Sequence, residues 1–274
     1  MPSIGTAITV ISQRKVADFV LVVSALREEM KPLIRKLRRP ERRRAGPTRL
    51  YRSRQVGTGP ELRLLVTGDG AGRAKNGIAA FFDLVSAVGS DHCSAVIVIG
   101  VSGGVTPDLT VGELIVGNRV ALDRSEAEAA MEMSYQSRQS TPWMQNQVAG
   151  LVVTVSHLAD TVSAKAALRR RWEGIGGGPI AVDLESYWYV AAAESRGIPW
   201  TVIRAVSDTS MESLPRYLDS CRDEDGATNR FKVLWRALIN PASWPALIRL
   251  GCRTASSAAR LERAVMGLVV ERMS

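Results

Sequence analysis

The sequence has few of the residues that mark disulfide-rich, metal-binding or triad-bearing proteins. Its 274 residues include three cysteines, Cys93, Cys221 and Cys252, without the spacing of a zinc site or a disulfide framework. We therefore expect reduced, buried thiols in a cytoplasmic protein. The two histidines, His92 and His157, fit neither a metal-ligand spacing nor a Ser-His-Asp arrangement. The sequence thus predicts no metal site and no catalytic triad.

Long apolar runs are also missing. Apolar runs such as residues 19–23, or residues 62–66 with Arg63 among them, are far too short to span a bilayer. Residues 1–16 show no early positive charge followed by a long apolar block, so no secretory signal is evident. At 46% hydrophobic composition the chain can still bury a full core. We expect a cytoplasmic protein, with any contact to the inner membrane being peripheral.

The net charge of +9 is unevenly distributed. Lysine and arginine are dense over residues 31–54, where Tyr51 is the one aromatic residue. Such a group could meet nucleic acid or an anionic membrane surface. Because no aromatic platform and no nucleic-acid module pattern accompany it, we expect a solvated loop or hairpin face and no nucleic-acid partner.

Buried strands alternate with helices along most of the chain, which predicts an α/β fold with a mainly parallel sheet covered on both faces. Two further strand-like runs, 49–56 and 61–67, are joined by a Gly-Pro-containing turn and suggest a hairpin. The expected strands are 18–26, 94–100, 112–122, 151–155, 180–184 and 200–206, and the expected helices are 27–37, 73–88, 164–172 and 187–195.

The C-terminal part of the chain has a different hydrophobic pattern. We expect a catalytic domain over residues 18–227 and an amphipathic helical extension over 228–274, in which tryptophans stand among basic residues. Such helices could lie in a membrane interface, or pack on their own domain or a second subunit, and packing is the favoured interpretation. Residues 124–150 are polar and weakly periodic, so we expect a long loop bordering a site.

Polar or glycine signals follow several predicted strands, where open α/β sheets bind ligands. Glu29 follows the first strand, and glycine-rich turns lie at 67–72 and 100–104. Each has an ordinary alternative, since acidic residues suit a first helical turn and glycines suit tight turns. The pairs Asp183/Glu185 and Ser207/Asp208 end two more strands, and carboxylates there could bind sugar hydroxyls or protonate a leaving group.

The order of these motifs resembles the purine nucleoside phosphorylase and methylthioadenosine/adenosylhomocysteine nucleosidase superfamily. The motifs are "VVSALREEMKPL", "TGDGAGRAKNGIAA", "VIVIGVSGGVTPDLTVGELIV", "AVDLES" and "IPWTVIRAVSDTS". The resemblance covers roughly residues 18–210 and implies a three-layer α/β/α sandwich around a central mixed sheet. "AVDLES" and the "SLP" after "SDTS" look most like the hopanoid-associated phosphorylases, which are thought to release adenine from adenosylhopane.

The resemblance also implies roles for particular residues. Asp208 would protonate N7 of the departing purine and Ser207 would position it, as the catalytic pair. Glu185 would hold the ribose hydroxyls, with Leu184 lining the sugar face. The further substrate-binding candidates are Asp183, Gly68, Gly70, Gly103, Gly104 and Leu158.

Two departures concern the base and the nucleophile. Leu158 stands where the nucleosidases stack the base on phenylalanine, and Trp143, Tyr187 or Trp188 could replace that contact, although core packing is expected for each. Glu29 matches the residue that helps activate water in the nucleosidases. The arginines that hold phosphate in hexameric phosphorylases have no counterpart at their usual places, although Arg27 or Arg73 could substitute.

We therefore expect hydrolysis, without a cofactor, of an adenine nucleoside with a bulky apolar 5′ group. Phosphate remains possible as a co-substrate. The alternatives are an ordinary methylthioadenosine/adenosylhomocysteine nucleosidase, a phosphate-dependent phosphorylase, and a non-catalytic nucleoside-binding scaffold. The expected partners are a lipid-linked nucleoside and a second copy of the chain in a homodimer, and residues 228–274 could also touch a membrane surface.

Overall fold

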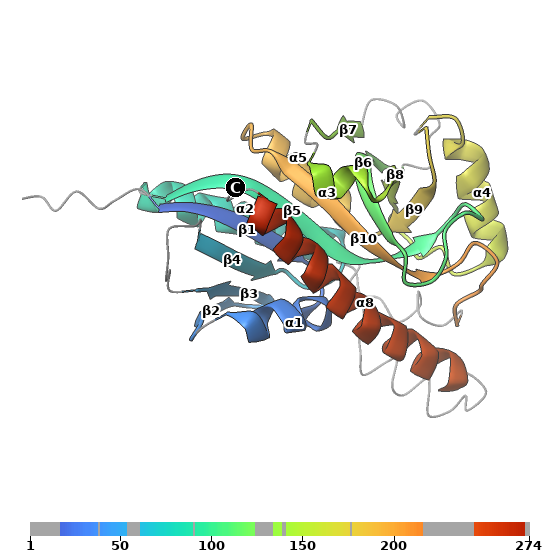
Figure 1. The fold of residues 1–274 in the computed structure, drawn as a ribbon, viewed down its shortest axis with the longest axis horizontal. Coiled ribbons are helices and arrows are strands. Elements are labelled where there is room, and N and C mark those ends of the chain that lie inside the picture. The colour runs from blue at the N-terminus through green and yellow to red at the C-terminus, as the bar shows by residue number, and fades with distance from the viewer. Residues whose placement is uncertain are drawn as a thin grey trace, which may run out of the picture.

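The structure is a computed structural model, which describes residues 17–37, 39–53, 61–89, 91–123, 134–138, 141–175, 177–215 and 244–271. Strands and helices alternate through most of these ranges (Figure 1). The strands are β1 (Ala17–Ser24), β2 (Glu41–Ala45), β3 (Thr48–Arg52), β4 (Glu61–Val66), β5 (Asp91–Gly104), β6 (Leu114–Leu122), β7 (Ser134–Gln136), β8 (Val148–Thr154), β9 (Ile180–Asp183) and β10 (Trp200–Asp208). The helices are α1 (Arg27–Lys36), α2 (Ala71–Val88), α3 (Pro142–Gln145), α4 (Val162–Trp172), α5 (Ser186–Glu194) and α8 (Trp244–Glu271).

The strands form one mixed sheet in the order β10-β6-β8-β9-β5-β1-β4-β3-β2, with β7 beside β6. β1 is parallel to both β4 and β5, and β10 is parallel to β5. The end of the long strand β5 also pairs with β9, so β5, β9, β8, β6 and β10 close into a ring. This closure brings the carboxyl ends of strands that are distant in sequence to one place.

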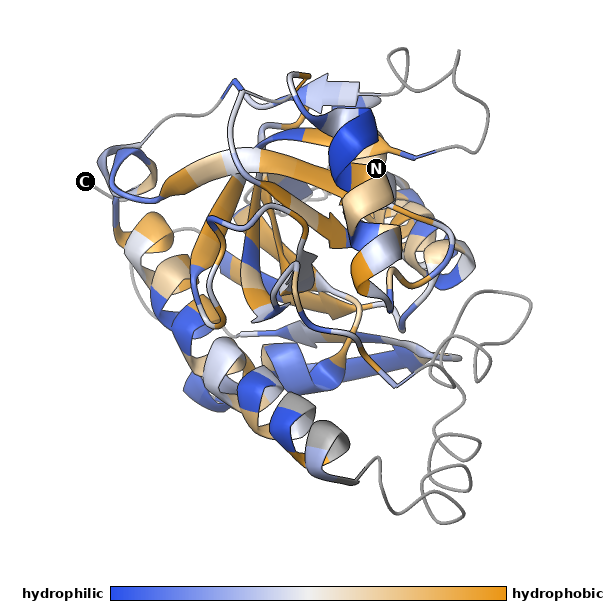
Figure 2. Ribbon diagram, turned by 90° about the vertical axis from the view of Figure 1, so that its right-hand side faces the viewer, coloured by the Kyte–Doolittle hydropathy of each residue, from blue (hydrophilic) through white to orange (hydrophobic). Residues whose placement is uncertain are grey.

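Helices cover both faces of the sheet (Figure 1). α1 and α8 share one apolar core with Val20, Val22 and Ile97, whereas α2 and α5 pack on the opposite face against Phe19 and Leu21. The alternation of these inward residues along β1 follows from the two-residue period of a strand. Figure 2 shows the central strands as largely hydrophobic, which is expected for strands buried on both faces. The structure thus has the predicted three-layer α/β/α architecture around a mixed sheet.

Most predicted elements are confirmed. Part of the basic region 31–54 forms a hairpin, in which β2 pairs with β3 and is exposed along its length. The predicted partner strands β3 and β4 pair as expected, while their connection at residues 54–60 lies outside the described residues. The prediction of one long loop over residues 124–150 is wrong for its described part, which contains β7, α3 and the start of β8. β7 and β8 are formed by backbone hydrogen bonds to β6, which is distant in sequence. The residues of this region therefore show little hydrophobic periodicity from which strands could be predicted.

α8 is packed on its own sheet. Its Leu261, Val265 and Leu268 are buried in the core that α1 shares, whereas Ile248 near its start is 64% exposed. The first part of the predicted helical extension, residues 228–243, lies outside the described residues. In the described ranges, no helix combines the length and apolar character that crossing a bilayer requires.

The expectation of buried thiols is correct for Cys93 and wrong for Cys252. Burial raises the pKa of the Cys93 thiol to about 11. Cys252 is exposed because it lies on the outer side of α8, before the helix reaches the core. Cys221 lies outside the described residues.

Candidate active site

A cavity of about 280 Å³ opens where the strand ends of the closed ring meet. The carboxyl ends of β5, β9 and β10 contribute to its wall, as do the segments that follow β1, β4, β8, β9 and β10 and one residue of α8. The lining residues are Ala25, Leu26, Glu29, Asp69, Val101, Ser102, Gly103, Val155, Leu158, Ala159, Val182, Asp183, Leu184, Glu185, Ser207, Asp208, Leu214 and Thr254.

Glu29 is held by backbone donors at the start of α1. Its Oε2 accepts a hydrogen bond from Leu26 N at 3.1 Å, and its Oε1 accepts one from Val101 N at 3.0 Å. Burial raises the pKa of this carboxyl above its ordinary value, with the Arg204 charge acting in the opposite direction. Two backbone amides and a nearby cation therefore fix a buried carboxyl group at the cavity wall.

Arg204 lies within β10 and is fully buried beneath the cavity. It forms an ion pair with Asp183, and its Nη2 donates to Ser186 Oγ at 2.7 Å. A Cβ on Gly100 would lie only 1.9 Å from Arg204 Nη1, so the glycine leaves the room that the guanidinium occupies. Asp183 is therefore a partner of Arg204, and Thr154 Oγ1 donates to its other oxygen at 2.6 Å.

Glu185 lies at the start of α5 and is also buried. Its Oε1 accepts a hydrogen bond from Gly70 N at 2.8 Å. Burial, followed by the negative charge of Asp183, raises the pKa of Glu185 to about 8. The ionised form of this carboxyl group would therefore be stabilised by a positive charge brought close to it.

Asp208 ends β10, next to Ser207. Ser207 Oγ lies 2.5 Å from Asp208 Oδ1 and 3.1 Å from the carbonyl oxygen of Ser102. Asp208 Oδ2 pairs with the ammonium group of Lys165, a fully buried residue of α4. The two carboxyl oxygens therefore have different partners, a hydroxyl group and a cation.

The structure brings most predicted site residues to one cavity. Glu29, Ser207, Asp208 and the substrate-binding candidates Asp183, Leu184, Glu185, Gly103 and Leu158 all line it. Gly70 contributes through its bond to Glu185. Gly68 and Gly104 do not line the cavity: a Cβ on Gly68 would face Arg73 and Pro47, and one on Gly104 would face the Asp208 backbone and Leu109.

The aromatic candidates for base stacking belong to the core, as expected. Tyr187 and Trp188 pack with the cluster beneath α5, and Trp143 lies against Gly267 of α8. Among the described cavity-lining residues none is aromatic, so Leu158, Val155 and Val182 supply the apolar surface available to a base.

Two buried cations of the site were missed by the sequence reasoning, and each left a signal. Arg204 interrupts an otherwise apolar strand. Lys165 shares one helix face with Leu168 and Trp172, at spacings of three and seven residues, and all three are buried. A basic residue on an apolar strand or helix face indicates a buried partner, because an isolated buried charge is strongly unfavourable.

The cavity wall is acidic. Five carboxyl side chains line it, and within the described ranges neither lysine nor arginine does. Arg204 and Lys165 lie behind this surface, each paired with a carboxylate. Despite the acidic side chains, no cluster of His, Cys, Asp or Glu in the described part of the chain fits a metal ion.

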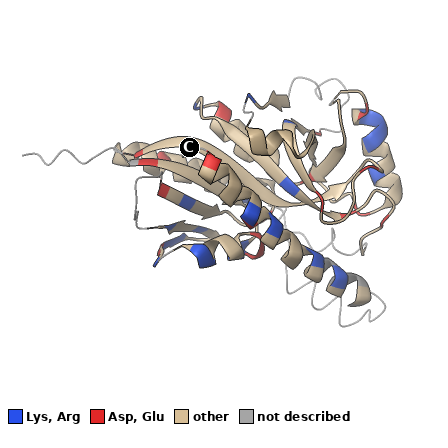
Figure 3. Ribbon diagram, viewed as in Figure 1, with Lys and Arg blue, Asp and Glu red and all other residues tan. Residues whose placement is uncertain are grey.

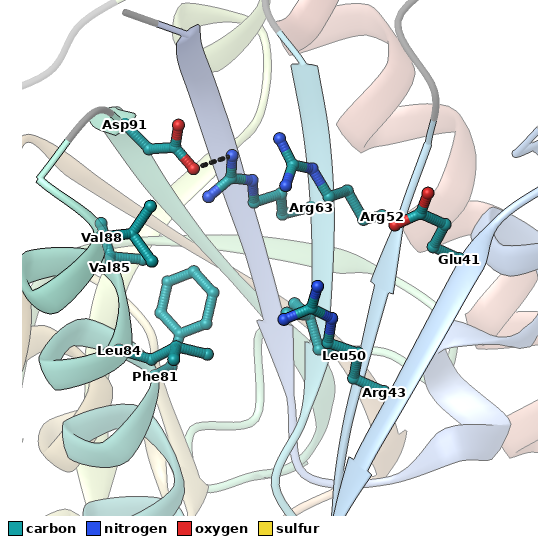
Figure 4. A pocket seen from close by; sticks show the side chains of 10 residues that line it. All are labelled: Glu41, Arg43, Leu50, Arg52, Arg63, Phe81, Leu84, Val85, Val88 and Asp91. Carbon is teal, nitrogen blue, oxygen red and sulfur yellow. Dashed lines mark hydrogen bonds and ion pairs between the residues drawn. The ribbon is translucent and has the colours of Figure 1, made fainter. Parts of the chain in front are cut away.

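The basic hollows of the molecule lie elsewhere. A hollow of about 130 Å³ at the amino ends of β4 and β5 contains Arg43, Arg52 and Arg63, and Figure 4 shows Arg63 directed at Asp91. Arg63 also pairs with Glu61, as does Arg52, so these two charges are locally neutralised. A wider, open hollow beside β2 and α2 contains Arg43, Arg44 and Arg73. Figure 3 shows further basic residues on α4 and α8.

Residues 19–238 of the chain match the sequence model of the phosphorylase superfamily. No curated protein sequence matches the chain significantly. A solved structure of the 5′-methylthioadenosine/S-adenosylhomocysteine nucleosidase of Neisseria meningitidis, with methylthio-immucillin-A, is 17% identical at a TM-score of 0.61, covering 90% of this chain and 98% of that one. The S-adenosylhomocysteine nucleosidase of Streptococcus pyogenes is 19% identical at a TM-score of 0.59, covering 94% and 99%. The native futalosine hydrolase of Helicobacter pylori is 18% identical at a TM-score of 0.61, covering 92% of this chain and 98% of that one. At these identities the likeness concerns the fold.

Proposed function

The chain belongs to the phosphorylase superfamily and is an enzyme of the purine nucleosidase or nucleoside phosphorylase type, and on that premise we propose that it hydrolyses the N-glycosidic bond of an adenine nucleoside. The C1′–N9 bond breaks, its electron pair leaves with the purine, and water adds to C1′. The products are free adenine and a free ribosyl sugar. The observation that carries the choice of water is the acidic, arginine-free wall of the cavity.

Asp208 acts as the acid for the leaving group. It gives its proton to N7 of the purine as the C1′–N9 bond breaks, which prevents charge from accumulating on the base. Because Oδ2 already accepts from Lys165, the proton is carried by Oδ1, next to Ser207. After the transfer, the Ser207 hydroxyl can donate to the carboxylate.

The remaining carboxyl groups suit a reaction in which the sugar becomes cationic. An oxocarbenium-like ribosyl group is stabilised by nearby carboxylates that are fixed in advance. Glu185 would accept the ribose hydroxyls, and Glu29 would orient a water at C1′ and accept its proton. The backbone donors to both side chains hold them in place before substrate binds.

Water is favoured over phosphate on electrostatic grounds. Five carboxyl groups line the cavity. The two buried cations behind its wall, Arg204 and Lys165, are already ion-paired with Asp183 and Asp208. A phosphate dianion would therefore find no charge-assisted hydrogen-bond partner on the described cavity wall. The positions of Arg27 and Arg73 add no cation to the described wall.

The 5′ group of the substrate is proposed to be bulky and apolar. Val155, Leu158, Ala159, Leu184 and Leu214 form an apolar part of the cavity wall, which a polar amino-acid tail would not satisfy. This composition and the resemblance of "AVDLES" to the hopanoid-associated enzymes support a lipid-linked nucleoside such as adenosylhopane. Methylthioadenosine is the second candidate, since its short thioether also suits an apolar wall.

The test is product analysis with adenosine, methylthioadenosine and 5′-alkylthioadenosines of increasing chain length, with and without phosphate. We expect adenine and free ribosyl sugar at equal rates in both buffers. We also expect kcat/KM to rise with chain length, by roughly a factor of four for each methylene fully buried. A sugar 1-phosphate formed only with phosphate would contradict hydrolysis, and a kcat/KM that falls with chain length would contradict the lipid-linked substrate.

Replacement of Asp208 separates an enzyme from a non-catalytic binder. Asp208→Asn should lower kcat by about 10²–10⁴-fold, the contribution typical of a general acid, while adenine still binds. Asp18→Asn, which alters an exposed carboxylate on the amino end of β1, is the matched control and should retain wild-type kcat. Equal activity of wild type and Asp208→Asn would contradict the assigned acid.

Membrane contact is part of the same proposal. The exposed start of α8, with Ile248, lies six residues from Thr254 in the cavity wall, or about 9 Å along a helix. A lipid chain leaving the cavity could therefore reach the bilayer on which α8 rests, while the head remains in the site. The homodimer expected from the resemblance remains a prediction.

A further inference from the structure

Lys165 is a buried cation without an evident structural need. Its side chain is fully buried in α4, and an ammonium group removed from water is strongly destabilising unless it is paired and hydrogen-bonded. An apolar residue at this position would continue the face formed by Leu168 and Trp172. The position of Lys165 is therefore better explained by what it contacts than by stability.

All three N–H groups of the ammonium have partners at the end of β10. One meets Asp208 Oδ2, and the others donate to the carbonyl oxygens of Thr209 at 2.6 Å and Glu212 at 2.9 Å. An ammonium has three donors and no acceptor, so this set saturates it. Lys165 therefore binds the proposed acid and the segment that follows it as one unit.

The segment 209–214 is itself part of the cavity wall. Leu214 lines the cavity, and its N–H donates to Asp160 O at 2.7 Å. Arg253 of α8 donates to the Glu212 carboxylate at 3.0 Å and to Ser207 O at 3.1 Å. Because Arg253 and the Leu214 amide also hold this segment, the contact of Lys165 that bears on the proposed chemistry is its ion pair with Asp208.

We propose that Lys165 is a positioning residue for the leaving-group acid: it fixes Asp208, directs the proton to Oδ1 and neutralises the carboxylate left when the purine takes that proton. The inference rests on the proposed glycosidic cleavage. The balance is simple, because the proton moves from Asp208 Oδ1 to purine N7 and the new negative charge lies beside the ammonium. Lys165 does not touch the substrate, as it does not line the cavity.

The test replaces Lys165 with methionine, which keeps the length of the side chain and removes the charge. We expect kcat for adenine release to fall about 10²-fold, within the range for a general acid, while KM and the dissociation constant of adenine change less than about threefold. The solvent deuterium isotope effect on kcat should rise, because proton transfer becomes slower relative to the other steps. Arg169→Met, one turn further along α4 and exposed, is the matched control and should retain wild-type kinetics.

The other outcomes are equally informative. An unchanged kcat would overturn the role of Lys165, as would a loss explained by fewer adenine-binding molecules with an unchanged isotope effect, since that indicates structural damage. If the methionine variant does not fold, Lys165→Gln, which retains donors for the two carbonyls, takes its place with the same expectations. Wild-type protein that releases no adenine would instead overturn the proposed function, so the two failures are distinguishable.

Discussion

At the scale of single residues, the site is a set of carboxyl groups whose environments differ. Glu29 is held by two backbone amides, Asp183 by Arg204, and Asp208 by Lys165. Glu185 has one backbone donor and no ion pair among the contacts described above. Burial without a fully compensating cation is what raises the pKa of Glu185 to about 8.

This raised pKa predicts how stability depends on pH. Between the ordinary pKa of about 4.5 and about 8, folded Glu185 holds a proton that the unfolded chain has released, so its contribution to stability falls as pH rises through that window. Glu185→Gln removes the titration. The variant should therefore gain free energy of unfolding over wild type, on the order of a few kcal/mol at about pH 8.5 and less at about pH 5.5, while losing activity.

The measurement is urea unfolding of both proteins at the two pH values. Glu173→Gln is the control, because Glu173 is exposed on the surface beyond α4 and should change stability little at either pH. A difference between Glu185→Gln and wild type that does not grow with pH would contradict the assignment.

At the scale of elements, α8 joins the site to the core. Its buried face, which includes Leu261, Val265 and Leu268, packs on the sheet beside α1. Earlier in the helix, Thr254 lines the cavity and Arg253 donates to Ser207 O. The amphipathic pattern of residues 228–274 indicated a helical extension, but a basic amphipathic helix can lie on a bilayer, on a partner or on its own sheet. The second half of α8 packs on its own sheet because the sheet offers an apolar face for it to cover.

Two valines of α8 allow this packing to be measured. Val265 is fully buried and Val270 is 57% exposed. Val265→Ala should lower the free energy of unfolding by about 2 kcal/mol through lost burial and a small cavity. Val270→Ala, the same change on the same helix, should stay within about 0.5 kcal/mol of wild type. Equal effects in denaturant unfolding would mean that α8 does not pack on the sheet in solution.

At the scale of the whole molecule, charge is segregated. The net charge of the chain is +9, and many of its arginines lie on β2, α4 and α8. The cavity, by contrast, is lined by five carboxyl groups. A basic exterior favours an anionic surface, and an acidic cavity favours a cationic transition state. This distribution of charge suits the proposed enzyme, which would approach an anionic bilayer and cleave the uncharged nucleoside of a lipid-linked substrate.

Vesicle binding tests this arrangement. Wild-type protein should sediment with vesicles containing anionic lipid, and Ile248→Asp should sediment less, because the change places a negative charge on the exposed start of α8. Val270→Asp, a matched change at the far end of the helix, should bind as wild type does. Loss of binding in both variants, or in neither, would contradict docking through the start of α8.

The sequence by itself determined the alternation of strands and helices and the polar strand ends, because hydrophobic period and strand termini are local properties of the chain. Together with the resemblance to the nucleoside phosphorylase superfamily, these strand ends led us to predict that Glu29, Glu185, Ser207 and Asp208 share one site. Only the tertiary structure decided which cations lie behind them. Lys165 reaches Asp208, which lies 43 positions further along the sequence, and Arg204 occupies space left by Gly100. Such pairings depend on how β5 bends to close the ring with β9 and β10, and long-range closure leaves no periodic trace in the sequence.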